Sequence, residues 1–178
     1  MAQATQAVVD ELVGNAHGNL ERVEELLEAH PELLNAKATW NETPIEAATQ
    51  MGNRAIIEFL IARGAPVDFF TGLVLGRVDE VTPDRANSRG IHDLPALYFA
   101  AIGGSIQVAQ ALLEAGADVN ARSQAAAPIH GAVMGRSPDM VKLLLDNGAD
   151  PSLQDYAGRD ARTLALEMKR EDVAEVFS

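Results

Sequence analysis

A short stretch that contains Gly-Ala recurs along this chain. Two apolar residues come first, then two polar or small residues, then Gly-Ala and a short extended piece, in residues 60–68, 112–120 and 144–152. Such a stretch is typical of the last turn of an amphipathic helix, because glycine takes the left-handed conformation that ends many helices. The second and third copies are 32 residues apart (144 − 112). A period of this size predicts stacked helical repeats.

The residues upstream of these stretches look like helix starts. Thr43-Pro44-Ile45-Glu46-Ala47-Ala48 precedes one copy, and Ala127-Pro128-Ile129-His130-Gly131-Ala132 precedes another. A threonine hydroxyl caps free N–H groups, and proline suits the first helical position. Both segments resemble the Thr-Pro-Leu-His-x-Ala pattern of the ankyrin repeat. The resemblance covers nearly all 178 residues and implies an all-α ankyrin-repeat solenoid of helix-turn-helix units with short hairpin fingers.

The repeat boundaries predict one ankyrin-repeat domain, residues 1–178. About six repeats are expected: an N-terminal cap at 4–35, then 36–67, a truncated repeat at 68–94, 95–126, 127–157, and a C-terminal cap at 158–178. A terminal repeat has one neighbour and needs a polar outer face. Glutamates at 21, 24, 25 and 28 give the first repeat such a face.

The third repeat departs from the pattern. Its first helix is expected at 69–77, directly after Asp68, so a hairpin finger is missing. A second helix begins at Val78 but meets Pro83, which disfavours helix in the residue before it. Residues 83–95 are polar and are predicted to form a loop. The truncated helix is either a weak point in the stack or a place for a partner or a second copy of the chain.

Composition limits the possible partners and compartments. The formal net charge of −12 argues against binding a nucleic-acid backbone; it serves solubility or attracts a partner with a basic surface. The absence of cysteine excludes disulfides and thiolate zinc sites. The first residues carry no basic charge, and no stretch approaches eighteen apolar residues. A cytoplasmic protein without a membrane partner is expected, as a monomer or weak homodimer.

No sequence motif for catalysis or cofactor binding is present. Glycine-rich phosphate loops, His-Glu-x-x-His and Gly-x-Ser-x-Gly are all missing. Of the four histidines, His130 stands at the histidine position of the ankyrin pattern, where the resemblance implies that the imidazole bonds loop backbone. No histidine pair has metal-ligand spacing on a helix. No catalytic residue, metal or cofactor is therefore predicted.

The remaining candidate is a surface. In ankyrin-like stacks the first helices and the fingers line a concave groove that usually binds partners. Residue-by-residue mapping places these positions there: Trp40, Asn41, Gln50, Met51, Val74, Phe99, Ile102, Arg122, Gln124, Met134, Asp155 and Tyr156. The apolar ones among them are expected to form an exposed stripe: Trp40, Phe99, Ile102, Met134 and Tyr156. For each alone, packing against the neighbouring repeat is the alternative.

The sequence thus predicts a non-enzymatic module that binds a partner protein through its concave groove. One alternative is an inhibitor or immunity-type protein that masks a basic enzyme surface. Another is a small-molecule-binding protein or enzyme that uses the groove. An enclosed pocket with perturbed carboxylates or histidines would favour the last reading, and an open, shallow groove would favour the first two.

Overall fold

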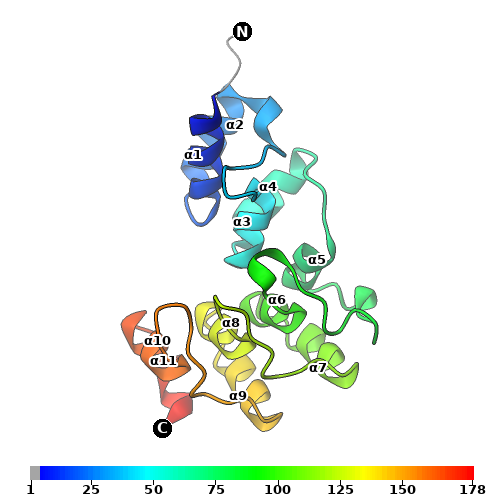
Figure 1. Ribbon diagram of the computed structural model, residues 1–178, viewed down its shortest axis with the longest axis vertical. Helices are drawn as coiled ribbons and strands as arrows, with labels where there is room; N and C mark the ends of the chain where they lie inside the picture. Colours follow the sequence, from blue (N-terminus) through cyan, green and yellow to red (C-terminus); the bar gives the residue numbers. More distant parts are fainter. Residues whose placement is uncertain (1–4) are drawn as a thin grey trace. The chain divides into compact units, whose positions relative to one another are not determined.

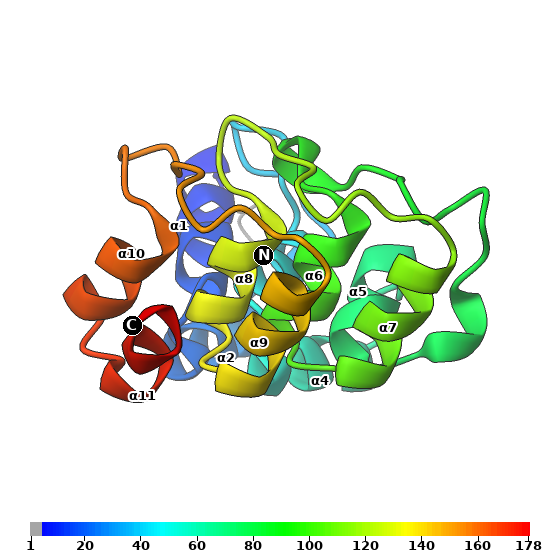
Figure 2. The same cartoon turned by 90° about the horizontal axis from the view of Figure 1, so that it is seen from below.

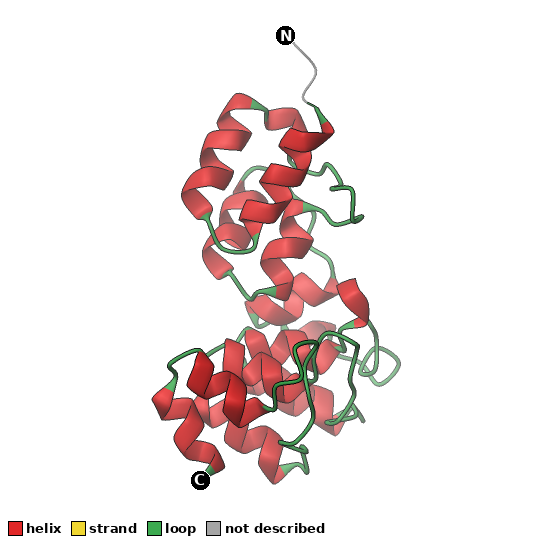
Figure 3. Ribbon diagram, turned by 60° about the vertical axis from the view of Figure 1, so that its left-hand side comes forward, coloured by secondary structure: helices red, strands yellow, loops and turns green. Residues whose placement is uncertain are grey.

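The computed structural model describes residues 5–178. The chain divides into two compact units, residues 1–71 and 72–178. In the described residues of both units, regular structure consists of helices joined by turns and loops, with one isolated β-bridge and no strand (Figure 3). The predicted all-α class is confirmed. The predicted single domain of about six repeats stays a prediction.

The first unit contains two helix pairs, coloured blue to cyan in Figure 1. The elements are α1 (Gln6–Ala16), α2 (Leu20–Ala29), the short 3-10 helix η1 (Pro31–Leu33), α3 (Pro44–Gln50) and α4 (Arg54–Ala62). Helix α1 packs against α2 and α3, and α3 packs against α4. Thr43 and Glu46 form a complete capping box at the start of α3, as its Thr-Pro sequence predicts. Apolar residues such as Leu12, Ile56 and Leu60 are fully buried between these helices.

The second unit continues the helix pairs. Helix α5 (Phe69–Leu75) crosses the boundary between the units. Then follow η2 (Val78–Glu80), η3 (Ile91–Asp93), α6 (Ala96–Ile102), α7 (Ile106–Glu114), α8 (Pro128–Met134), α9 (Pro138–Asp146), α10 (Ala161–Glu167), α11 (Glu171–Ala174) and η4 (Glu175–Phe177). Helices α6, α8 and α10 pack in one row, and α7, α9 and α11 pack in a second row (Figure 1). No helix among residues 5–178 is long and apolar enough to cross a bilayer.

Glycine allows close approach within the first row. A Cβ atom at Gly131 of α8 would lie 2.9 Å from the carbonyl oxygen of Tyr98 on α6. At Gly135, directly after α8, it would lie 2.5 Å from the carbonyl oxygen of Ile102. Because α8 lies this close to α6 while α7 covers another side, every residue of α6 is buried.

Asparagine side chains join successive repeats of the second unit. Asn120 donates from Nδ2 to the Gly148 carbonyl at 2.9 Å and accepts from the Asp150 N–H at 2.8 Å. Asn87 makes the same pair of bonds one repeat earlier, to Gly116 and Asp118, both at 2.9 Å. Each side-chain amide therefore bonds one backbone carbonyl and one backbone N–H that follow a helix of the neighbouring repeat, and both groups gain a partner.

The segment around Asn87 corrects the predicted loop at 83–95. Its second half forms a hairpin finger, closed by a β-bridge between Arg89 and Pro95 and by the Gly90 N–H donating to the Leu94 carbonyl at 2.9 Å. Upstream, the predicted truncated helix is the single 3-10 turn η2. The carboxylate of Glu80 on that turn lies 3.5 Å from Arg77 Nη1 and 3.9 Å from Arg85 Nη1.

Candidate functional site

Three fingers of the second unit lie side by side (Figure 2). They comprise residues 88–95, 121–126 and 154–159, and together we call them the three-finger surface. Direct bonds join them. Arg89 donates from Nη1 to the carbonyl of Arg122 at 3.1 Å, and the Tyr156 N–H donates to the carbonyl of Ala125 at 3.0 Å. The fingers therefore form one continuous surface.

The tip of the first finger has an unusual backbone. His92 and Asp93 both lie in the left-handed region, with φ of 54° and 58°. Two such residues in succession are uncommon for side chains other than glycine and cost free energy. The Arg89 guanidinium holds the turn, because it donates to the Asp93 carbonyl at 3.0 Å and lies 3.7 Å from the Asp93 carboxylate. Both tip side chains are exposed.

The second finger alternates between buried and exposed residues. Ala121 and Ser123 are buried, whereas Arg122 and Gln124 are exposed. The Ser123 hydroxyl accepts the N–H groups of Ala125 and Ala126 at 3.0 and 3.2 Å, which closes the turn. Arg122 and Gln124 thus flank Ser123 in the sequence, and both of their side chains are exposed.

A buried carboxylate builds the third finger. Asp155 accepts the N–H groups of Ala157 and Arg159, both at 2.9 Å, and pairs with Arg159 Nη2 at 2.7 Å. Burial raises the pKa of Asp155, but the bonds from Arg159 and Ala157 outweigh burial, so the pKa lies below its ordinary value. The finger is thus held by an ion pair at its base, and its tip residue Tyr156 remains outside.

An open depression of about 620 Å³ lies between the three finger tips. It is lined by His92, Asp93, Gln124, Ala125 and Tyr156. Tyr156 is 78% exposed, and the Arg159 guanidinium lies 5.7 Å from the centroid of its ring. Tyr156, Gln124, Asp93 and His92 give the lining an aromatic ring, an amide, a carboxylate and an imidazole.

The first unit holds a separate polar cluster around Glu42. This side chain is 1% exposed. Its carboxylate accepts from Trp40 Nε1 at 2.8 Å and from Gln50 Nε2 at 2.6 Å, and His17 Nε2 lies 3.5 Å away. Several donors therefore compensate the buried carboxylate, which otherwise would be costly. The cluster fixes the finger that carries Trp40.

Comparison with known proteins agrees with the repeat architecture. Residues 73–155 match the family model of ankyrin repeats in three copies. Ankyrin repeats therefore make up residues 73–155 of the chain. Ankyrin repeats are in general non-enzymatic modules for protein–protein interaction.

Three relatives illustrate the range of proteins that this chain resembles. An ankyrin repeat protein of Rickettsia felis is 30% identical over 119 residues, which is 62% of this chain and 45% of the relative. An ankyrin repeat-containing protein of Treponema pallidum is 36% identical over 125 residues, 69% of this chain and 36% of the relative. Human BCL-6 corepressor-like protein 1 is 33% identical over 138 residues, 77% of this chain and 8% of the relative. The chain spans less than half the length of each.

The structure separates the predicted groove residues of this ankyrin repeat protein into exposed and buried positions. Gln124 and Tyr156 come together at the depression, and Arg122 is exposed beside them. In the first unit Trp40 and Gln50 meet at Glu42, and Asn41 and Met51 are exposed. Trp40 is 44% exposed and Met51 39%. Whether any of these residues binds a partner stays a prediction.

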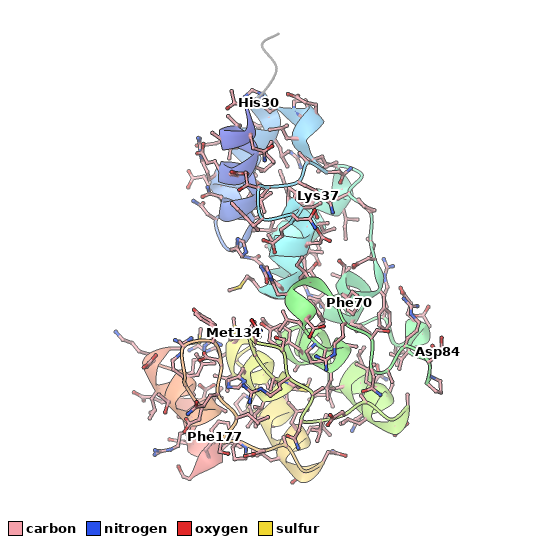
Figure 4. All side chains as sticks on the ribbon, viewed as in Figure 1. His30, Lys37, Phe70, Asp84, Met134 and Phe177 are labelled. Carbon is pink, nitrogen blue, oxygen red and sulfur yellow. The ribbon has the colours of Figure 1, made fainter. Side chains whose placement is uncertain are left out.

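The predicted exposed stripe is wrong at Phe99 and Ile102, which are 0% and 4% exposed. Val74, another predicted groove residue, is 1% exposed. The close approach of neighbouring elements covers α6 and the end of α5. Met134 is half-buried, and Tyr98 Oη lies 3.6 Å from its sulfur; Figure 4 labels this residue on α8. Asp155 is buried and belongs to the structure of its finger rather than to the exposed surface.

Sequence reasoning missed the first finger of this surface. Asn87, Arg89, His92 and Asp93 all fall within the predicted polar loop. A signal was present, since Asn87-x-Arg89 recurs as Asn120-x-Arg122 after 33 residues (120 − 87). The missing outer helix hides this period when only helix patterns are compared.

The expected structural role of His130 is confirmed. The Ala127 N–H donates to its Nδ1 at 3.1 Å, and its Nε2 lies 3.2 Å from the Arg159 carbonyl oxygen, which can only accept. Burial lowers the pKa of His130, so the neutral ring fits this pattern of one acceptor and one donor. No group of three or more metal-ligating side chains gathers anywhere in residues 5–178.

Proposed function

We propose that this chain binds a partner protein through the three-finger surface, with no catalytic step. One observation carries the proposal: Tyr156 stands 78% exposed beside an open depression that three bonded fingers create. Tyrosine is enriched at the energetic centres of interfaces. The fingers are held by Arg89 and by backbone bonds before any partner arrives, which lowers the ordering cost of binding.

The charge of the partner is a separate part of the proposal. Residues 1–71 carry eleven Asp or Glu against four Lys or Arg. This excess supports attraction of the first unit to a basic partner surface, including that of an inhibited enzyme. A cytoplasmic location and a monomeric or weakly dimeric state also remain predictions from the sequence.

A small-molecule site or an enzyme is less well supported. The depression is open, and its lining residues His92, Asp93, Gln124 and Tyr156 are all exposed. A site that works on a small molecule usually buries most of the ligand surface. We therefore propose a macromolecular partner.

Site-specific photo-crosslinking tests the proposal. A photoreactive amino acid at Gln124 is expected to crosslink one partner protein in extract of the source cells. The same amino acid at Leu166 is the matched control, because Leu166 is 50% exposed on α10 and lies outside the three-finger surface. Tyr156→Ala is expected to remove the Gln124 crosslink while the melting temperature stays unchanged.

Two outcomes would contradict the proposal. One is crosslinking of the same protein from Leu166 but not from Gln124, which would move the interface to α10. The other is a Gln124 crosslink that survives Tyr156→Ala at full yield, which would remove Tyr156 as the anchor.

A further inference from the structure

The three-finger surface differs in charge from the chain as a whole. Each finger carries one arginine, namely Arg89, Arg122 and Arg159, and the carboxylates on the same fingers are Asp93 and Asp155. One residue beyond the third finger, Asp160 caps α10 and accepts the Thr163 N–H at 2.7 Å. The fingers therefore hold more arginines than carboxylates, although the chain has a net charge of −12.

Both finger carboxylates are already paired. Asp93 lies 3.7 Å from Arg89 Nη1, and Asp155 lies 2.7 Å from Arg159 Nη2. Arg122 differs, because its guanidinium makes no ion pair or hydrogen bond with any of the residues that the structure describes. Arg159 is also paired with Glu167 of α10, which lies 3.2 Å from its Nη1. Arg122 is therefore the finger arginine whose charge has no ion-pair partner among the described residues.

Hydrogen bonding holds the backbone of Arg122 in place. The Arg122 carbonyl accepts a bond from Arg89 at 3.1 Å, and the next residue, Ser123, is buried in the turn of the second finger. Arg122 is exposed and stands two residues before Gln124, which lines the depression. Two residues of chain span at most about 7 Å, so the Arg122 backbone lies beside the lining of the depression.

We propose that the depression binds an extended peptide segment of the partner that carries an aspartate or glutamate, and that Arg122 pairs with this carboxylate. The inference rests on the proposed function of the three-finger surface. A guanidinium presents two parallel N–H donors that match the two oxygens of a carboxylate. Tyr156 then packs against the residues beside the acidic one, and Gln124 bonds their backbone.

The negative charge of the whole chain limits how acidic the segment is. At physiological ionic strength interactions between exposed charges are screened beyond about 8 Å. A carboxylate in contact with Arg122 therefore gains the full local attraction, while distant carboxylates of the helices act weakly on it. A long acidic run would extend past the finger and meet those carboxylates. The segment is expected to hold one or two acidic residues.

Selection from a displayed random-peptide library tests this inference. Peptides are kept only if they bind the wild-type chain and fail to bind Tyr156→Ala, which restricts them to the three-finger surface. We expect an Asp or Glu at one fixed position of the kept peptides. Arg122→Gln is expected to weaken their binding by about tenfold or more, because a charge-assisted pair is lost. Arg162→Gln, an equal charge change at an exposed arginine of α10, is expected to have little effect.

A charge exchange makes the test specific. Arg122→Glu is expected to lose the acidic peptides and to bind versions in which Lys replaces the fixed acidic residue. Kept peptides without an acidic position, or with binding that Arg122→Gln leaves unchanged, would overturn the inference but leave the three-finger surface as a binding site. Failure to obtain any peptide sensitive to Tyr156→Ala would overturn the proposed function as well.

Discussion

Nε2 of His130 and the carbonyl oxygen of Arg159 lie 3.2 Å apart, so one buried ring joins the start of α8 to the end of the third finger. The same ring accepts the N–H of Ala127 through Nδ1 at 3.1 Å. Ala127 stands where a capping threonine is typical and has no hydroxyl. His130 thus supplies the capping acceptor and also anchors the finger that carries Tyr156.

The free energy of unfolding is expected to fall as pH drops below about 6.5, the ordinary histidine pKa. Burial lowers the pKa of His130 in the folded state and outweighs the Arg159 bond and the Asp155 charge, which raise it. The unfolded chain therefore takes up a proton first. The stabilisation from neutral His130 is complete above the unfolded pKa and is lost as pH falls toward the folded one. Urea titrations from pH 8 to pH 5 measure this loss.

The control for this prediction removes the His130 ring. His130→Gln is expected to lower stability at pH 8 by about 1–3 kcal/mol, because a buried bonding pattern is broken, and to flatten the pH dependence. An unchanged slope in His130→Gln would assign the pH dependence to other groups.

Gly131→Ala is expected to destabilise the chain by about 1–3 kcal/mol, because the new Cβ would lie 2.9 Å from the Tyr98 carbonyl oxygen. Gly14→Ala in α1 is the matched change, since a Cβ added at Gly14 would meet no atom within 4 Å. That variant is expected to gain up to about 1 kcal/mol from helix propensity. Urea denaturation of both variants compares them directly. Equal stabilities would mean that α6 and α8 do not approach closely in solution.

Asn87→Ala is expected to cost about 1–3 kcal/mol, because it leaves the Gly116 carbonyl and the Asp118 N–H without their side-chain partner. Asn120→Ala removes the equivalent bonds to the next repeat and is expected to cost a similar amount. Asn35→Ala, at an exposed position of the first unit, is the reference and is expected to change stability little. Urea denaturation of the three variants measures these differences. If Asn87→Ala leaves the stability unchanged while Asn120→Ala lowers it, the truncated repeat does not depend on the Asn87 bonds.

Arg136→Gly is expected to stabilise the chain by about 1 kcal/mol. Arg136 has φ of 57°, in a turn where the other repeats place Gly52 and Gly104 with φ of 64° and 72°. A side chain in this region costs roughly 1–2 kcal/mol relative to glycine. Arg136→Ala keeps the free-energy cost of the left-handed backbone but removes the charge of Arg136. That charge is the second cause, besides burial, of the lowered pKa of Arg170. A gain in the glycine variant alone assigns the effect to the backbone, and thermal melts of the two variants decide between the causes.

Most helices of this chain could be predicted from local signals. The Thr43-Pro44 start of α3 and the glycine after α7 are local sequence signals. They can be recognised without knowing the neighbouring repeats. Exposure could not be predicted in the same way. Phe99 lies on a short helix that is covered from several sides, and the close approach that Gly131 allows becomes visible only when α6 and α8 are placed together.

The polar sites are also partly hidden from sequence reasoning. Glu42 reads as a surface carboxylate, yet His17 and Gln50 from two other elements surround it. Tyr156 and Gln124 can be found from sequence because finger positions follow the repeat period. Their neighbours His92 and Asp93 are harder to find, because their repeat lacks its outer helix and only the Asn-x-Arg recurrence marks its finger.

Because of the paired bonds of Asn87 and Asn120, the spacing of the helices does not depend on the length of a finger. Asn87 stands nine residues before the start of α6 and Asn120 eight before the start of α8, yet each holds the neighbouring repeat in the same way. A protein engineer can therefore lengthen or exchange a finger tip while the helices keep their register. The chain offers a scaffold whose finger loops can be rebuilt one at a time.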